Sequence, residues 1–145
     1  MNIAEIMTQT VTTTWKENML LESDNPHGNH VLMETDPNFG GSNQGLNPKA
    51  LMLSSIGGCT GLDVVALLKK MRVEIDDFKV VVGANMTSEH PKYYDKVNID
   101  YYFTGTDLNE DKIKKAVSLS EERYCGVIKM FRAFAEVTIA IHINE

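Results

Sequence analysis

The segment from Asn47 to Met71 constrains the fold of this chain more than any other part of it. Asn47-Pro48 is typical of a helix start, because the Asn side chain can accept a hydrogen bond from an orphan backbone N–H and proline lacks that donor. The residues that follow are apolar or small on every helical face in the first half. We therefore expect a central helix over about 48–71 that is buried all round, between a sheet and another layer or inside a dimer.

Extended segments flank this helix on both sides. Runs of β-branched and aromatic residues broken by turn residues predict an N-terminal β-meander over about 8–35. Alternating apolar and polar residues predict a β-hairpin over about 78–104. A helix at about 109–125, then a helical turn and a strand at about 127–143, complete one α+β domain over 1–145.

Composition excludes several classes of partner. The chain has 145 residues, enough for a core without disulfides, and a net charge of −6. No basic cluster interleaves with aromatic residues, so we expect no nucleic-acid or anionic-membrane surface. The longest uncharged, mainly apolar stretch, Ala50–Leu62, is shorter than the roughly 18 residues that span a bilayer. The first five residues, Met-Asn-Ile-Ala-Glu, do not resemble a secretion signal, so we expect a cytoplasmic protein with reduced thiols.

The two cysteines are the residues most able to carry chemistry. Cys59 lies in the middle of the central helix, among three glycines, and Cys125 lies at the expected end of the second helix. In a reducing compartment such a pair is either two unrelated core residues, or a redox or metal pair that the fold brings together. Composition alone favours two core residues, because free cysteine is among the most buried residue types.

A reactive cysteine at position 59 needs a neighbouring positive charge. The start of its own helix is too distant to help, and Asp63, one turn along the same face, disfavours a thiolate unless a cation is held by both side chains. Lys16, Lys49 and Arg123 are candidate cations, and their spacing singles out none of them.

Other patterns predict no metal and no cofactor. The four histidines show no paired ligand spacing, and two cysteines with scattered histidines make a poor zinc signature. The glycine-rich segment 40–45 lacks the Lys-Ser/Thr ending of a phosphate-binding loop and is interpreted as a loop.

Three stretches together resemble the OsmC/Ohr family, and most closely its YhfA-like branch of predicted redox proteins. The first is Gly45-Leu46-Asn47-Pro48, and the second is Gly57-Gly58-Cys59-Thr60 with the following Asp63-Val64-Val65. The third is Ser118-Leu119-Ser120-Glu121-Glu122-Arg123-Tyr124-Cys125. The similarity covers nearly the whole chain.

The resemblance implies an α+β fold in an intertwined homodimer, with a long central helix packed between strongly curved antiparallel β-sheets. It also implies two active sites at the dimer interface, where Cys59 is the peroxidatic thiolate and Cys125 the resolving thiol. An organic hydroperoxide would oxidise Cys59 to a sulfenic acid, which forms a disulfide with Cys125. An external dithiol would restore both thiols, and no metal or organic cofactor is required.

The chain departs from the family pattern at two positions. The best-characterised members have an arginine in the N-terminal strand region that holds the thiolate, and a glutamate directly after the Asn-Pro pair. Here no arginine precedes Arg72, and Lys49 and Ala50 follow Pro48. The alternative is therefore a non-catalytic small-ligand-binding protein on the same scaffold, with the cysteines lining an apolar pocket, and a purely structural role is third.

Overall fold

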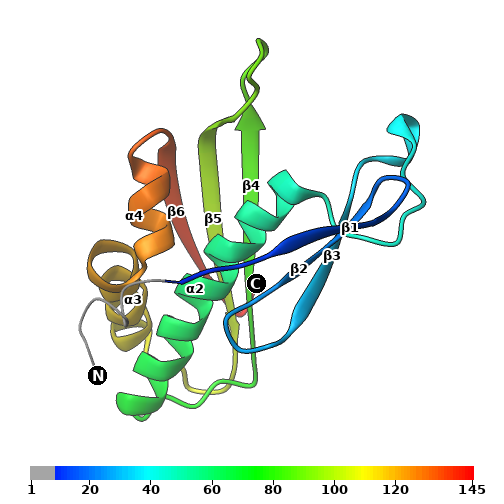
Figure 1. The fold of residues 1–145 in the computed structure, drawn as a ribbon. Coiled ribbons are helices and arrows are strands. Elements are labelled where there is room, and N and C mark those ends of the chain that lie inside the picture. The colour runs from blue at the N-terminus through cyan, green and yellow to red at the C-terminus, as the bar shows by residue number, and fades with distance from the viewer. Residues whose placement is uncertain (1–8) are drawn as a thin grey trace. The chain divides into compact units, whose positions relative to one another are not determined.

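The computed structural model describes residues 9–145, which divide into two compact units at Met52 and Leu53 (Figure 1). Thr8, the first residue of the expected meander, lies outside the described residues. The described part of the chain is mixed α+β, with two three-stranded sheets and three α-helices. The strands are β1 Thr13–Glu17, β2 Leu20–Asp24, β3 His30–Glu34, β4 Asp77–Met86, β5 Tyr94–Thr104 and β6 Glu136–Ile143. The helices are η1 Pro37–Phe39, α2 Pro48–Lys70, α3 Glu110–Leu119, η2 Ser120–Tyr124 and α4 Gly126–Arg132.

The first unit is built on the antiparallel sheet β1-β2-β3. Glu34, at the end of β3, is buried and accepts three hydrogen bonds from the segment that follows. The Ser42 backbone N–H donates at 2.9 Å, the Ser42 hydroxyl at 2.6 Å and the Gln44 backbone N–H at 2.8 Å. These bonds, the Ser42 hydroxyl first, lower the pKa of Glu34 to about 2. The loop after β3, which the sequence identifies only by its composition, is thus held against β3 by hydrogen bonds to the Glu34 carboxylate.

The second unit contains the sheet β4-β5-β6. Strand β5 pairs with β4 in the antiparallel direction and with β6 in the parallel direction. The expectation of antiparallel sheets is therefore wrong for this sheet, which is mixed. The chain leaves β5 and returns through α3, η2 and α4, and a helical crossover of this kind brings the next strand back in the same direction.

The core of the second unit lies between this sheet and α2 from Leu53 onward. Ile56, Val64 and Leu68 of α2 are buried in one cluster with residues of β5, α3 and α4. A methyl group added at Gly57 or Gly61 would meet side chains of β4 at 3.7–4.0 Å, so these two glycines lie against the sheet. The members of the cluster on β5, α3 and α4 are Tyr94, Val97, Ile99, Tyr101, Phe103, Ile113, Ala116, Val117, Ile128 and Phe131.

The opposite face of α2 is exposed in the part of the second unit that the structure describes. Leu62 is 74% exposed and Val65 48% exposed, although the sequence predicts burial on all sides. By length and composition alone, α2 is the one helix of the described residues that is apolar enough to span a membrane, with Asp63 near its middle. The uncharged stretch Ala50–Leu62 is therefore shorter than the apolar helix that contains it, Pro48–Lys70.

The hydrogen bonds that the Glu34 carboxylate accepts make the stability of the first unit depend on pH. The pKa of Glu34 is lower in the folded chain than its ordinary value of 4.5, so its stabilising contribution is complete above about 4.5 and is lost as pH falls toward about 2. Glu34→Gln is expected to lower the urea midpoint, followed through Trp15 fluorescence, at pH 6, and to lower it progressively less toward pH 2. Exposed Glu17→Gln serves as the matched control. If the urea midpoint of Glu34→Gln lies below that of wild type by the same amount at every pH, this account is contradicted.

Candidate functional site

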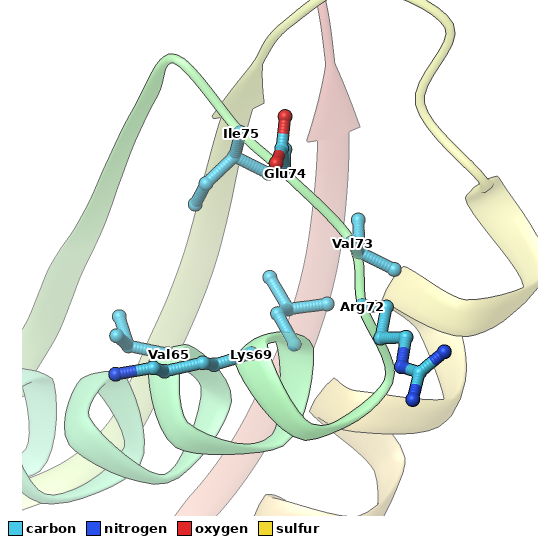
Figure 2. Close-up of a pocket in the computed structure, with 7 residues that line it drawn as sticks. Val65, Lys69, Arg72, Val73, Glu74 and Ile75 are labelled. Carbon is cyan, nitrogen blue, oxygen red and sulfur yellow. The ribbon is translucent and has the colours of Figure 1, made fainter.

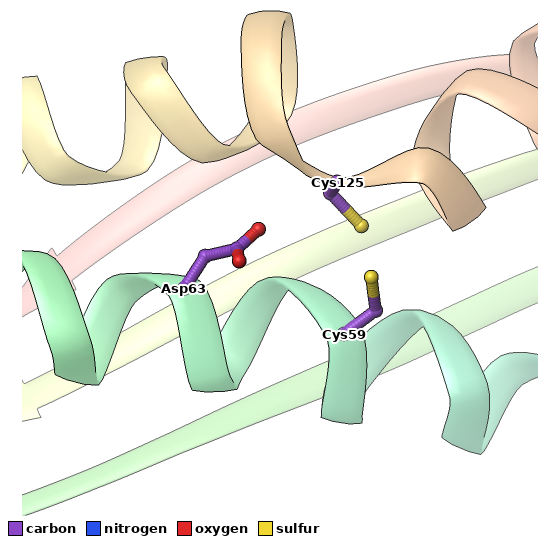
Figure 3. A group of neighbouring side chains, drawn as sticks. All are labelled: Cys59, Asp63 and Cys125. Atoms are coloured by element: carbon purple, nitrogen blue, oxygen red, sulfur yellow. The ribbon is translucent and has the colours of Figure 1, made fainter. Parts of the chain in front are cut away.

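The side chains of Cys59, Asp63 and Cys125 meet in the second unit (Figure 3). Both sulfur atoms and a carboxylate oxygen of Asp63 all lie within 4.8 Å of one another. Cys59 and Asp63 are one helical turn apart on α2 and therefore project from the same face. Cys125 points at Cys59 from the turn between η2 and α4. The structure thus brings the two cysteines together, and their catalytic role stays a prediction.

A π-helical turn delivers Cys125 to this position. Helix α3 is followed directly by η2, and the Cys125 backbone N–H closes η2 by donating to the Ser120 carbonyl five residues earlier, at 2.8 Å. Such turns insert one extra residue per turn and occur often at functional sites. Helix α3 and this turn together occupy most of the helical segment expected over 109–125, and the turn leaves Tyr124 exposed and Cys125 only 4% exposed.

Arg132 of α4 connects this helix to the π-helical turn through hydrogen bonds and an ion pair with Glu121. Its guanidinium donates to the Glu121 carbonyl at 2.7 Å and to the Glu121 carboxylate at 2.6 Å. Cys125 lies beside a charged cavity of about 320 Å³, which is lined by Glu121, Glu122, Arg123, Tyr124, Cys125, Gly126, Lys129 and Arg132. Arg132 therefore serves as a structural tie between the two segments that flank Cys125.

The surroundings of Cys125 favour its protonated form. Burial first, and then a hydrogen bond with Cys59 and the charge of Cys59, raise its pKa to about 11. The Ile128 backbone N–H, which donates to the Cys125 sulfur at 3.4 Å, acts in the opposite direction. At neutral pH, Cys125 is thus a thiol that lies next to the sulfur of Cys59.

A buried chain of hydroxyl groups holds Asp63 in place. Tyr101 and Thr60 are 2.8 Å apart at their oxygen atoms, Thr60 and Ser120 are 2.7 Å apart, and the Ser120 hydroxyl donates to the Asp63 carboxylate at 2.9 Å. Burial raises the pKa of Tyr101 to about 12, so its hydroxyl stays protonated. Sequence reasoning missed Thr60, Ser120 and Tyr101, because each is a single polar group within an otherwise apolar face.

The three candidate cations that the sequence offers for Cys59 are divided between the two units. Arg123 lines the charged cavity, with its guanidinium 5.6 Å from the centre of the Tyr124 ring. Lys16 and Lys49 belong to the first unit, in β1 and in the first turn of α2. Within residues 53–145, no Lys, Arg or His forms an ion pair with Asp63.

A second cavity of the same unit, of about 530 Å³, lies at the C-terminal end of α2 (Figure 2). It combines aliphatic side chains with three charged ones. Neither cysteine reaches it, so the cysteine cluster remains the candidate site. Its lining is Val65, Leu68, Lys69, Arg72, Val73, Glu74 and Ile75.

Comparison with known sequences identifies one family. The family model described as OsmC-like protein matches residues 41–140. Protein YhfA of Escherichia coli strain K12 is 31% identical over 124 residues, which cover 86% of this chain and 90% of the relative.

Solved structures share the fold over nearly the whole chain. A hypothetical protein from Aquifex aeolicus VF5 is 30% identical, with a TM-score of 0.82 over 94% of this chain and 96% of the other. An organic hydroperoxide resistance protein from Elizabethkingia anophelis, solved with thiocyanate bound, is 17% identical with a TM-score of 0.67 over 94% and 96% of the two chains. At that identity the second likeness shows the fold alone.

The hydroxyl chain predicts a specific cost of removing Thr60. Thr60→Val keeps the shape of the side chain and leaves the buried Tyr101 and Ser120 hydroxyls each without one partner. We expect the free energy of unfolding to fall by about 1–3 kcal/mol, measured by urea denaturation. Thr138→Val, which removes an exposed hydroxyl on β6, should change it by no more than about 0.5 kcal/mol. Equal losses in the two variants would show that the buried chain adds no stability.

Proposed function

The chain belongs to the OsmC-like protein family, and from this premise we propose that it reduces organic hydroperoxides with Cys59 and Cys125. The observation that carries the proposal is the placement of the partly exposed Cys59 next to the buried Cys125, with their sulfur atoms within 4.8 Å of each other. A peroxide can reach the first, and the second is held where it can attack the product. The Elizabethkingia structure, which shares the fold, carries the name of an organic hydroperoxide resistance protein.

In the first step the Cys59 thiolate attacks the hydroperoxide. A sulfur–oxygen bond forms as the oxygen–oxygen bond breaks, and the alkoxide leaves as the alcohol after taking up a proton. Cys59 is oxidised to a sulfenic acid by two electrons, and the peroxide is reduced by the same two. Cys59 is assigned this role because it is the more exposed of the two cysteines.

In the second step the Cys125 sulfur attacks the Cys59 sulfenic acid. A disulfide forms, the hydroxyl group leaves as water, and the Cys125 proton is given up. The Asp63 carboxylate lies within 4.8 Å of both sulfur atoms and is the nearest proton acceptor of the cluster. An external dithiol then exchanges with the disulfide, is itself oxidised to a disulfide and restores both thiols. A reducing compartment such as the cytoplasm supplies such a dithiol.

The assembly that fits this function is a homodimer. The uncovered face of α2 presents Leu62 and Val65 to solvent, and a second copy of the chain supplies an apolar surface that covers it. The intertwined arrangement with strongly curved sheets that the family resemblance implies belongs to this proposal.

The two cysteines are expected to fail in different ways when replaced. Without a reductant, wild-type protein and Cys125→Ser should each consume about one equivalent of cumene hydroperoxide per chain, whereas Cys59→Ser should consume none, because only Cys59 meets the peroxide. With a dithiol present, wild type should turn over repeatedly. Retention of the wild-type rate in Cys59→Ser would refute the proposal. An inactive wild type would favour the small-ligand-binding alternative.

The dimer proposal is tested by placing a charge on the uncovered face of α2. Leu62→Glu is expected to raise the dimer dissociation constant at least tenfold, measured by analytical ultracentrifugation, because the carboxylate is desolvated in the interface. Met130→Glu replaces a residue of α4 that is 62% exposed, and it should leave the constant unchanged. A monomeric wild type, or equal weakening in both variants, would contradict an interface on this face.

A further inference from the structure

We propose that the reduced protein binds Zn²⁺ through Cys59, Asp63 and Cys125. The proposal does not depend on the hydroperoxide chemistry, since it concerns only the reduced side chains. Their three ligand atoms already lie within 4.8 Å of one another. In a tetrahedral zinc site, with Zn–S about 2.3 Å and Zn–O about 2.0–2.2 Å, neighbouring ligand atoms are about 3.5–3.8 Å apart. Closing onto the ion therefore requires movements of about 1 Å.

The charges in the cluster point to a cation. Two thiols and a carboxylate converge, and within residues 53–145 no Lys, Arg or His forms an ion pair with Asp63. Zn²⁺ held by two thiolates and a carboxylate would balance the negative charge of its three ligands. The convergence of three such donor atoms is what a metal site needs.

The donor set selects the kind of metal. Mg²⁺ and Ca²⁺ take oxygen ligands, whereas a pair of thiolates favours Zn²⁺ among the common cellular cations that undergo no redox change. Three protein ligands leave one tetrahedral position for water or another small ligand. Cys59 is partly exposed, so solvent reaches this side of the cluster.

Outer hydrogen bonds already orient two of the three ligands. The Ser120 hydroxyl donates to one oxygen of the Asp63 carboxylate, and Thr60 holds Ser120 in turn. The Ile128 backbone N–H donates to the Cys125 sulfur at 3.4 Å. Bonds of this kind fix the direction of metal ligands and change metal affinity about 10–100-fold when they are removed.

Zinc binding and disulfide formation exclude each other, because both use the same lone pairs on the two sulfur atoms. Bound Zn²⁺ should therefore shield Cys59 from alkylation as well as from oxidation. This consequence can be measured in the unmodified protein, without reliance on the folding of any variant.

The test uses the full chain, reduced and freed of metal, with Zn²⁺ titrated against a chromophoric chelator. We expect one Zn²⁺ per chain, and a thiolate-to-metal charge-transfer band when Co²⁺ replaces it. Cys59→Ser and Cys125→Ser should each lower the affinity at least tenfold, and so should Asp63→Asn, which retains an acceptor for Ser120. Asp76→Asn, at an exposed carboxylate of the same unit, is the matched control and should bind as wild type does.

Three results would overturn the proposal. The first is a wild-type affinity no higher than that of the Cys59→Ser/Cys125→Ser double variant, which reports adventitious binding elsewhere on the chain. The second is wild-type affinity in Asp63→Asn, which would remove the carboxylate from the site. The third is alkylation of Cys59 by iodoacetamide at the same rate with and without one equivalent of Zn²⁺. No arm contains a peroxide, so failure here is distinct from failure of the hydroperoxide proposal.

Discussion

The buried hydroxyl of Thr60 is the contact on which the arrangement of the site depends. It lies 2.8 Å from the Tyr101 hydroxyl of β5 and 2.7 Å from the Ser120 hydroxyl, where η2 begins. One side chain of α2 therefore fixes the helix against both the sheet and the π-helical turn. Cys59 precedes Thr60 directly, and Cys125 ends the turn that Ser120 starts. A buried hydrogen bond is directional, and leaving it unmade costs free energy. The hydrogen bonds of Thr60 therefore fix the position of the Cys59 sulfur relative to the Cys125 sulfur.

The same geometry leaves the two cysteines chemically unequal. Cys125 is enclosed, accepts a backbone N–H and is protonated at neutral pH, whereas Cys59 lies on the partly open side of the cluster. This asymmetry suits an attacking sulfur and a resolving one. Asp63, oriented by Ser120, gives the pair a carboxylate that can accept a proton in the oxidative cycle or ligate Zn²⁺ in the reduced state. Both proposals thus draw on one cluster, and the oxidation state of the sulfur atoms decides between them.

Much of the fold follows from local sequence signals, whereas the site does not. The helix expected over 48–71 is found at Pro48–Lys70, because its Asn-Pro start and its apolar run are local features. The parallel pairing of β6 and the π-helical turn at Ser120–Tyr124 depend on tertiary packing, which no local pattern reports. Histidine spacing predicts no metal site, yet three potential ligands converge, because two of them come from α2 and the third lies 66 residues after Cys59. The pairing of the cysteines was expected from family resemblance, and the role of Thr60 was not expected at all.

The most direct test of the central claim is mass spectrometry of the intact protein after one equivalent of cumene hydroperoxide in the absence of a reductant. The account predicts a chain lighter by two hydrogens, with the loss mapped by peptide analysis to a disulfide between Cys59 and Cys125. An unchanged mass, or oxygen added at Cys59 without disulfide formation, would contradict the claim that the π-helical turn holds Cys125 in position to resolve the oxidised Cys59.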